Sequence, residues 1–106
     1  MTAIVAWEFR ARAGREAEFE THYGPSGTWA RLFARSSGYR GSTLARDAAD
    51  RGRYLLTDAW TDRAAFDAFR REWGADYEAF DRECEAVTVE ERCLGWFEAV
   101  EPAPGR

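Results

Sequence analysis

The sequence predicts an α+β fold in which four antiparallel strands carry their helices on one face. Over residues 54–69, apolar side chains alternate with a period of two as far as Trp60 and then recur at three- and four-residue steps, which is typical of a strand that turns directly into a helix. Similar strands open and close the chain, over residues 3–11 and 88–100. A polar loop at residues 47–52 joins two further strands as a hairpin, so these two run antiparallel.

The segment after the first strand is expected to be a helix in two pieces. Ala13–Gly14 ends the strand, and residues 15–23 have the composition of a helix. The sequence of residues 24–27, Gly-Pro-Ser-Gly, then interrupts the helical pattern, because two glycines and a proline do not continue a helix cheaply. A second piece is expected over residues 29–36, with Thr28 as its cap. The break is either a harmless insertion or a flap over a pocket.

The rest of the chain alternates strands and one long helix. Gly38 is expected to end the broken helix in the left-handed conformation. Strands are expected over residues 39–46 and 53–60, and a long helix over residues 62–84 with a bend at Gly74. In the last strand, regular alternation would place Cys93, Gly95, Phe97 and Ala99 on one face and Arg92, Leu94, Trp96 and Glu98 on the other.

The resulting order, β-α-β-β-α-β, is that of the ferredoxin-like sandwich, a four-stranded antiparallel sheet with both helices on one face. Both faces of the strands carry apolar side chains. In the first strand, for example, one face carries Val5, Trp7 and Phe9 and the other carries Ile4 and Ala6. Two helices cover only one face, and an uncovered apolar sheet face of this size is typical of a partner site. The simplest partner is a second copy, which gives a homodimer closed sheet to sheet as a dimeric α/β barrel.

Composition limits the class of protein. The 106 residues predict a single domain over residues 1–101 and a flexible tail over residues 102–106. A net charge of −4 argues against a nucleic-acid surface. Fifteen arginines without one lysine, asparagine or glutamine are typical of a GC-rich bacterial genome. No signal peptide or membrane span is expected, and the two cysteines, Cys84 and Cys93, indicate reduced thiols in a cytoplasmic protein.

With these elements in place, the chain resembles the antibiotic biosynthesis monooxygenase (ABM) superfamily, whose members are small dimeric α+β-barrel proteins. The resemblance covers residues 3–99 as a pattern. It rests on the Ala13–Gly14 turn, Phe19, Gly38–Tyr39 and above all the segment YLLTDAWTDRAAF at residues 54–66. This fold hosts cofactor-free quinol and anthrone oxygenases, haem-degrading enzymes, isomerases, cyclases and proteins with no known reaction, so the resemblance implies the fold more specifically than one activity.

Two departures from the family pattern narrow the function that the resemblance implies. Haem-degrading members have a histidine ligand about ten residues beyond the strand-end tryptophan, where this chain has Arg70. Those members and the aromatic-polyketide oxygenases use an asparagine side chain in their sites, and this chain contains no asparagine. Leu56, four residues before Trp60, occupies the position where the oxygenase pattern has that polar side chain. We therefore expect no haem and no other cofactor, and a direct copy of the anthrone chemistry is in doubt.

Three side chains are candidates for catalysis. Trp60 offers a ring and an indole N–H, or else fills the core. Asp58 shares a strand face with Trp60, so its carboxylate requires either an arginine partner, such as Arg92 or Arg10, or a catalytic role. His22 is the single histidine and precedes the glycine-rich break, although a lone helical histidine is more often a surface residue. No metal site is expected.

The aromatic side chains predict a pocket for a flat ligand. Cofactor-free oxygenation needs an electron-rich substrate, a dry aromatic pocket, donors to a developing oxyanion and a base. We expect a small aromatic molecule of the phenolic or quinol type as substrate of a monooxygenase-like enzyme. The alternatives are a non-catalytic small-molecule-binding protein and an isomerase or cyclase on the same scaffold. The residues expected to contact the ligand are Trp7, Tyr23, Trp29, Tyr54, Trp73 and Tyr77.

Overall fold

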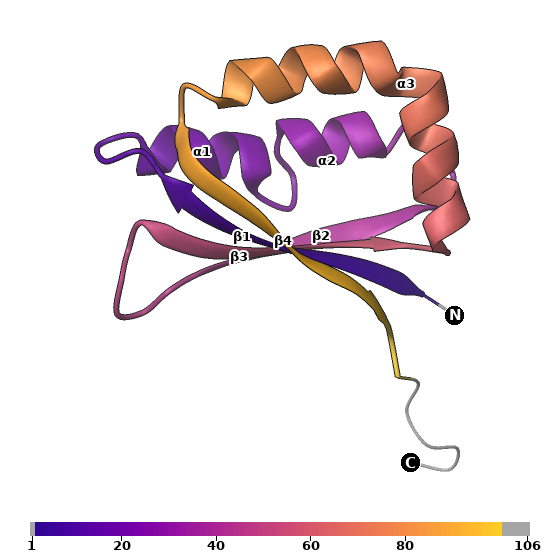
Figure 1. Cartoon of the computed structure of the whole chain (residues 1–106), viewed down its shortest axis with the longest axis horizontal. Coiled ribbons are helices and arrows are strands. Elements are labelled where there is room, and N and C mark those ends of the chain that lie inside the picture. The colour runs from indigo at the N-terminus through magenta and orange to yellow at the C-terminus, as the bar shows by residue number, and fades with distance from the viewer. Residues whose placement is uncertain (1, 101–106) are drawn as a thin grey trace.

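The structure is a computed structural model and describes residues 2–100. Its four strands form one antiparallel sheet in the order β2-β3-β1-β4, and all three helices lie on one face of it (Figure 1). The predicted ferredoxin-like arrangement is therefore confirmed, whereas the predicted tail at residues 102–106 lies outside the described residues. In chain order the elements are β1 (Ala3–Ala11), α1 (Glu16–Tyr23), α2 (Thr28–Phe33), β2 (Tyr39–Arg46), β3 (Arg53–Trp60), α3 (Arg63–Cys84) and β4 (Thr88–Glu98).

The pairing of β1 with β3 decides which side chains face the helices. Trp7 lies opposite Leu56, and Phe9 lies opposite Tyr54. Because strand side chains alternate between faces, the residues in register with these also point toward the helices, and Asp58 is among them. The buried core lies on this side, with Phe9, Tyr54 and Leu56 in one continuous cluster. The opposite face of the sheet carries no helix (Figure 1).

A β-bulge corrects the alternation expected for β4. The pairing of β1 with β4 shifts register between Ala6 and Trp7, so that Cys93 lies opposite Trp7 but Trp96, rather than Gly95, continues that face opposite Val5. The extra residue reverses the facing of every later side chain relative to the regular pattern. Consequently Trp96 packs against Phe66 of α3, with ring centroids 5.4 Å apart. Trp96 and Cys93 were predicted on opposite faces, and that prediction was wrong.

The turn from β3 into α3 follows the sequence prediction. The Asp62 carboxylate accepts a hydrogen bond from the Ala65 N–H at 2.8 Å and so caps the helix, as expected. Thr61 serves differently, because its main-chain N–H donates to the Gly38 carbonyl at 2.8 Å. The helix bends at Trp73, whose φ and ψ of −114° and 20° are not helical, one residue before the predicted bend. Its second half therefore runs across the sheet above α1 and α2 (Figure 1).

Gly38 is required for close approach rather than for a left-handed turn. Its φ is not positive, in contrast to the prediction. A Cβ atom at this position would lie 2.5 Å from the Cβ atom of Ala65 and 3.1 Å from Oγ1 of Thr61. The absence of a side chain thus lets the loop before β2 touch the first turn of α3. This contact, together with the hydrogen bond from Thr61, fixes the strand-to-helix turn against its neighbouring strand.

The break between α1 and α2 is a tight turn. A Cβ atom on Gly27 would lie 2.5 Å from the Thr21 carbonyl oxygen, so the turn folds directly onto the end of α1. Thr28 does not cap α2, because Gly27 is the cap residue and no side chain accepts from the first turn. The Thr28 hydroxyl instead lies 3.1 Å from Nδ1 of His22. Within residues 2–100, no helix is both long enough and apolar enough to cross a membrane.

The close approach at Gly38 generates a stability prediction. Gly38→Ala should lower the free energy of unfolding by about 2 kcal/mol, because the new methyl group has no space beside Ala65. Ala65→Gly alone should cost about 1 kcal/mol of helix stability. The double variant should be more stable than the sum of the two changes predicts, since the second substitution removes the clash. Urea unfolding of the four proteins measures this coupling, and strict additivity would contradict it.

Candidate functional site

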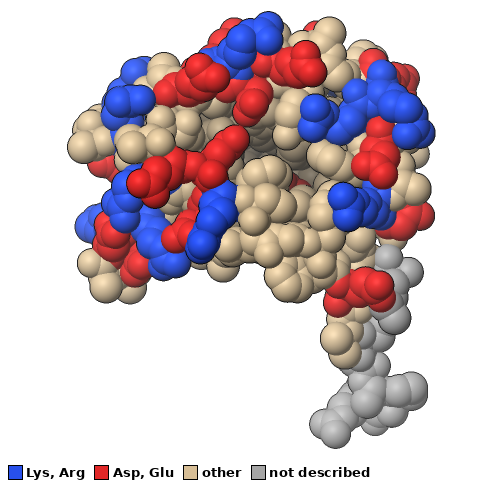
Figure 2. Space-filling view, in the orientation of Figure 1, with Lys and Arg blue, Asp and Glu red and all other residues tan. Residues whose placement is uncertain are grey.

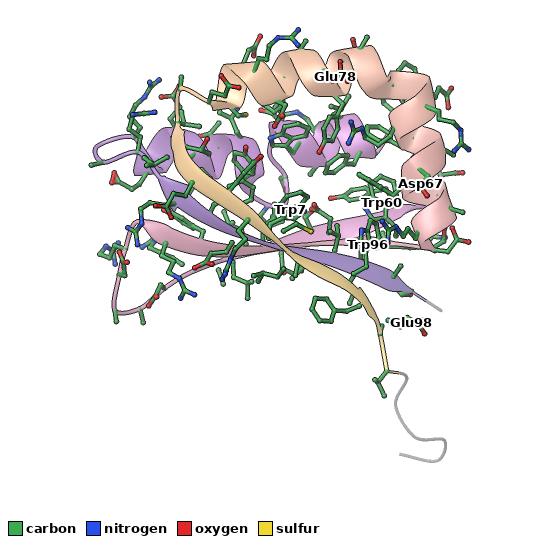
Figure 3. The ribbon with its side chains drawn as sticks, viewed as in Figure 1. Trp7, Trp60, Asp67, Glu78, Trp96 and Glu98 are labelled. Atoms are coloured by element: carbon green, nitrogen blue, oxygen red, sulfur yellow. The ribbon has the colours of Figure 1, made fainter. Side chains whose placement is uncertain are left out.

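A cavity lies between the helices and the sheet, on the side where α3 crosses β1 and β4. About 400 Å³ in this region is free of protein atoms, a volume that includes space open to solvent. Figure 2 shows a hollow in this region, and Figure 3 shows Trp7 below α2 with its side chain on the helix side of the sheet. Every strand except β2 and every helix contributes to the wall, which is formed by Trp7, Phe9, Tyr23, Trp29, Phe33, Leu56, Asp58, Tyr77, Asp81 and Glu91.

Asp58 is the buried acid of this cavity. Its side chain is on the helix face of β3, and the residue is only 4% exposed. Burial raises its pKa to about 6, although a hydrogen bond from Ser42 opposes this rise. A carboxyl group with a pKa near neutrality can accept and return a proton under physiological conditions.

A chain of hydroxyl groups holds Asp58 in place. The Ser42 hydroxyl donates to Oδ1 of Asp58 at 2.6 Å and lies 2.5 Å from the Tyr39 hydroxyl. Because Ser42 has one hydroxyl proton and directs it to the carboxylate, Tyr39 is the donor in the second contact. Both partners are on β2, which is paired with β3 in register so that Ser42 lies opposite Asp58. Asp58 itself belongs to the cavity wall.

The aromatic wall is densely packed and includes polar atoms without partners. The ring of Trp29 lies 4.9 Å from that of Tyr77, and Phe9 lies 4.7 Å from Tyr23, measured between centroids. The indole N–H of Trp29 is buried and approaches the Tyr23 hydroxyl and the Cys84 thiol without a hydrogen bond of good geometry to either. Burial raises the pKa of Tyr77 to about 12 and raises that of Tyr23 as well. Both phenol groups therefore stay protonated at neutral pH and are available as donors.

Two further carboxylates, those of Asp81 and Glu91, complete the wall, and the sequence analysis missed both. Asp81 follows Tyr77 by four residues and so shares its face of α3. Glu91 lies opposite Phe9 in the sheet. Partial burial, followed by the negative charges of Asp81 and Glu85, raises the pKa of Glu91. The helical spacing was a usable signal for Asp81, whereas the position of Glu91 depends on pairing that the sequence does not display.

The structure brings together five of the nine side chains predicted for the site. Asp58 lines the cavity, as do four of the predicted ligand-contacting residues, namely Trp7, Tyr23, Trp29 and Tyr77. Trp60 does not line it, because this ring is fully buried among aromatic side chains at the end of β3. His22 packs its ring edge to face against Phe80, at 5.2 Å. The catalytic roles of Trp60 and His22 stay predictions.

The remaining two predicted contact residues also lie away from the cavity wall. Tyr54 donates its hydroxyl proton to Glu20 at 2.6 Å, and its ring packs against that of Phe19 with centroids 4.6 Å apart. Trp73 lies beneath the guanidinium group of Arg35, at 4.8 Å, where α3 bends. Trp73 fits an aromatic stripe along α3, but a stripe along a bent helix does not face one direction. Their contact with a ligand stays a prediction.

Within the described residues, Asp58 has no arginine partner, although the sequence analysis considered Arg92 and Arg10 for that role. Arg10 pairs with Asp50, and Arg92 pairs with Glu8. Both arginines lie on the other face of the sheet from Asp58. Arg10 is paired in register with Arg53, and Arg92 with Glu8, and these residues are on the helix-free face. The burial of Asp58 is therefore balanced by one hydroxyl donor rather than by an opposite charge.

Comparison with known proteins gives one family. The family model "Antibiotic biosynthesis monooxygenase" matches residues 2–83. SnoaB, a cofactor-independent oxygenase from Streptomyces nogalater, is 26% identical over 97% of this chain and 97% of its own, with a TM-score of 0.74. No functionally curated protein sequence gives a significant match.

More distant structures share the fold. A protein from Bordetella bronchiseptica, described as a candidate antibiotic biosynthesis monooxygenase, is 24% identical over 94% of this chain and 98% of its own, with a TM-score of 0.74. Rv0793 from Mycobacterium tuberculosis is 14% identical over 97% of this chain and 99% of its own, with a TM-score of 0.67. Identities at this level support the arrangement of strands and helices, not a shared activity.

The raised pKa of Asp58 has a consequence for stability. The folded protein holds this proton up to about pH 6, whereas the ordinary pKa is 3.8. The contribution of Asp58 to stability is therefore present at low pH and is lost as the pH rises through 6, at a cost of about 2 to 3 kcal/mol. Asp58→Asn should then be more stable than the wild type at about pH 8 by up to that amount, with the difference vanishing near pH 4.

Urea unfolding at a series of pH values measures this difference. Asp67→Asn is the matched control, because Asp67 is an exposed residue of α3 that lies outside the cavity wall (Figure 3). It removes the same charge and should show no comparable pH-dependent gain. An Asp58→Asn protein that is equally stable as the wild type, or less stable, at about pH 8 would contradict the burial argument.

Proposed function

The chain belongs to the antibiotic biosynthesis monooxygenase family, and we propose that it is a cofactor-independent monooxygenase acting on a flat phenolic or quinol-type molecule. The single observation that carries the proposal is Asp58, an acid with a raised pKa in the wall of an aromatic cavity. The similarity to SnoaB, a cofactor-independent oxygenase, supports the reaction type. Aromatic walls favour a planar substrate, and the partly closed cavity limits its hydration.

In the proposed reaction Asp58 acts as the general base. Its carboxylate takes the proton of the substrate hydroxyl, which leaves an electron-rich phenolate in the cavity. The phenolate passes one electron to dioxygen, and the two radicals combine at a ring carbon that carries a hydrogen atom. The protonated Asp58 then gives its proton to the peroxide, so that the base is ready for a second proton transfer.

The second half of the reaction closes the atom and electron balance. Asp58 removes the hydrogen of the oxygenated carbon as a proton while the O–O bond breaks, which gives a carbonyl group and hydroxide. Asp58 returns this proton to the hydroxide as water. A phenol and one dioxygen molecule thus yield a quinone and one water molecule. One atom of dioxygen enters the product and the other leaves as water, and all electrons for oxygen reduction come from the substrate.

The polar groups of the wall support the charged intermediates. The hydroxyl groups of Tyr23 and Tyr77 stay protonated, and the N–H of Trp29 makes no hydrogen bond of good geometry within the described residues. Donors fixed at a cavity wall stabilise oxygen anions without the reorganisation that water requires. We assign them to the phenolate and peroxide oxygens. This set replaces the asparagine of the family pattern, since Leu56 at the corresponding position has no donor.

Two other functions lead to different outcomes of the same test. A small-molecule-binding protein would hold its ligand unchanged, and an isomerase or cyclase would work without dioxygen. The test incubates the protein with a panel of polycyclic phenols, with and without dioxygen, and analyses the products by mass spectrometry. The proposal expects a quinone that carries one labelled oxygen atom when labelled dioxygen is supplied. Product formation under anaerobic conditions, or tight binding without turnover, would contradict it.

The role of Asp58 as a base sets the effect of its substitution. Asp58→Asn should lower kcat/KM by about 10² to 10⁴-fold, because asparagine accepts no proton. In the wild type, kcat/KM should fall as the pH drops below about 6, where the carboxylate becomes protonated. Asp67→Asn, which changes an exposed residue of α3, should retain both the rate and the pH profile. If Asp58→Asn retains turnover, Asp58 is not the general base.

We also propose that a second copy covers the helix-free face of the sheet. Leu55, Leu94 and Phe97 are 46%, 41% and 52% exposed, and Phe97 pairs in register with Ile4 on this face. On the same side, Glu8 accepts hydrogen bonds from Arg53 at 2.5 Å and Arg92 at 2.6 Å. An apolar patch with a polar rim is typical of an isologous interface. A cytoplasmic location stays an expectation, supported by two free cysteines.

The dimer proposal is tested by charge insertion. The wild type should sediment as a dimer at micromolar concentration, and the double variant Leu94→Arg/Phe97→Arg should sediment as a folded monomer, because two buried guanidinium groups lack partners. Asp67→Arg is the control on the opposite side of the molecule and should leave the dimer intact. A monomeric wild type at this concentration would remove the proposal.

A further inference from the structure

Strand β2, at the edge of the sheet, contains a β-bulge at Arg40 and Gly41. In its pairing with β3, Tyr39 lies opposite Trp60 and Gly41 lies opposite Ala59, so Arg40 is an extra residue in β2. Gly41 has a φ of 120°, and a Cβ atom there would meet nothing within 4 Å, so the backbone conformation alone favours glycine. Bulges are frequent at sheet edges and beside active sites, where they redirect a side chain.

The bulge brings the side chains of Tyr39 and Ser42 to the same face of the sheet. The two residues are three positions apart, so regular alternation would place them on opposite faces. Because of the extra residue, both face the helices. Ser42 lies opposite Asp58, and the centroid of the Tyr39 ring lies 5.3 Å from that of Trp60 and 5.6 Å from that of Phe33 in α2. The Tyr39 hydroxyl consequently lies 2.5 Å from the Ser42 hydroxyl.

The two hydroxyl groups form a donor chain that ends on the carboxylate of Asp58. Ser42 donates to Oδ1 at 2.6 Å, and Tyr39 donates to Ser42. A hydroxyl group donates more strongly to a carboxylate than to a neutral carboxyl group, so this chain favours the ionised form of Asp58. The bond from Tyr39 polarises the Ser42 hydroxyl and strengthens its donation to Asp58.

The other titratable groups of the cavity wall do not offset the cost of burying this negative charge. The two phenols are neutral and donate no hydrogen bond to Asp58 within the described residues, whereas the two further carboxylates have its sign and oppose its ionisation. On the elements that pack around the cavity, these groups are Tyr23 of α1, Tyr77 and Asp81 of α3, and Glu91 of β4.

The hydrogen bond from Ser42 is therefore what opposes the effect of burial on Asp58. Burial raises the pKa of Asp58, and the Ser42 hydrogen bond lowers it. The guanidinium group of Arg70 on α3 lies 4.0 Å from the centre of the Tyr77 ring and forms no salt bridge with Asp58. Without the donor chain, a larger fraction of Asp58 would be protonated at neutral pH and unable to accept a proton.

We infer that Ser42 and Tyr39 are positioning residues of the proposed reaction, brought behind Asp58 by the bulge at Arg40 and Gly41, and that their donor chain keeps this carboxylate ionised at neutral pH. The inference rests on the proposed function only for the role of Asp58 as the base. The bulge thus has a chemical role, since it provides the second hydroxyl of the chain as well as the twist of an edge strand.

Carboxyl-carbon NMR of the ligand-free variants tests the inference without turnover. Ser42→Ala should raise the midpoint of the Asp58 titration by about one pH unit, because a hydrogen bond to a charged group is lost. Tyr39→Phe should raise it by roughly 0.3 pH unit, because only the polarisation of Ser42 is lost. Ser42→Thr retains a hydroxyl group and should keep the midpoint near pH 6.

Thr43→Ala is the matched control for the loss of a hydroxyl group from β2. Thr43 follows Ser42 directly, so it lies on the other face of the strand, where its hydroxyl contacts that of Thr57. This variant should leave the midpoint of Asp58 unchanged. Thermal unfolding of every variant confirms that the fold is retained.

The pH profile of turnover distinguishes a positioning role from a merely structural one. In Ser42→Ala, kcat/KM should be about fivefold below that of the wild type at pH 6 and equal to it at about pH 9, where Asp58 is ionised in both proteins. A merely structural role would lower kcat/KM by the same factor at both pH values, and that result would overturn the inference.

Three results of the NMR titration would also overturn the inference. They are a midpoint in Ser42→Ala at or below that of the wild type, a midpoint in Ser42→Thr as high as in Ser42→Ala, and an unchanged midpoint in Tyr39→Phe, which would leave the bulge without a role. If the midpoints move as expected but no phenol is oxygenated, the proposed function fails while the control of Asp58 ionisation by the donor chain stands.

Discussion

The packing of Trp60 is the interaction on which the arrangement of this fold depends. This fully buried ring ends β3 and lies within 5.3 to 5.7 Å of the rings of Phe33, Tyr39, Phe66 and Phe69. It thereby joins α2, β2 and both sides of the strand-to-helix turn, which Gly38 and Asp62 fix from outside. Because α3 leaves this cluster and then bends at Trp73, its second half crosses the sheet at a distance that leaves a cavity. The packing of Trp60 thus positions the elements around the cavity, although Trp60 does not line it.

The chemistry of the site follows from burying charge beside aromatic rings. Asp58 lies two residues before Trp60 on the same strand face, so the packing that orders the core also desolvates this carboxylate. One hydroxyl donor from Ser42 holds it without neutralising it. The raised pKa thus costs folding stability and provides a base near neutrality, which is the usual exchange of stability for function at such sites. Asp81 and Glu91 add two further carboxylates to the same wall.

Regular periodicity made most of the fold predictable. The first and third strands were predicted from period-two alternation, the second from the hairpin loop that follows it, and the cap at Asp62 from its position before an apolar helical stripe. Asp58 was identified because alternation placed an acid beside Trp60. The bulge in β4 left no local signal, so Trp96 was assigned to the wrong face. Glu91 was missed for a related reason, since strand pairing and the bend of α3 bring it to Asp81 and Tyr77, which are distant in sequence.

The Asp58 carboxyl group should titrate near neutrality because it is buried in the cavity wall. Carboxyl-carbon NMR of the ligand-free protein, with the resonance assigned by comparison with Asp58→Asn, measures that titration directly. A midpoint near pH 6 is expected for Asp58. Asp67, which is exposed on α3, provides a reference in the same spectra. A midpoint for Asp58 at about pH 4, the ordinary value for an aspartate, would show that burial does not raise its pKa.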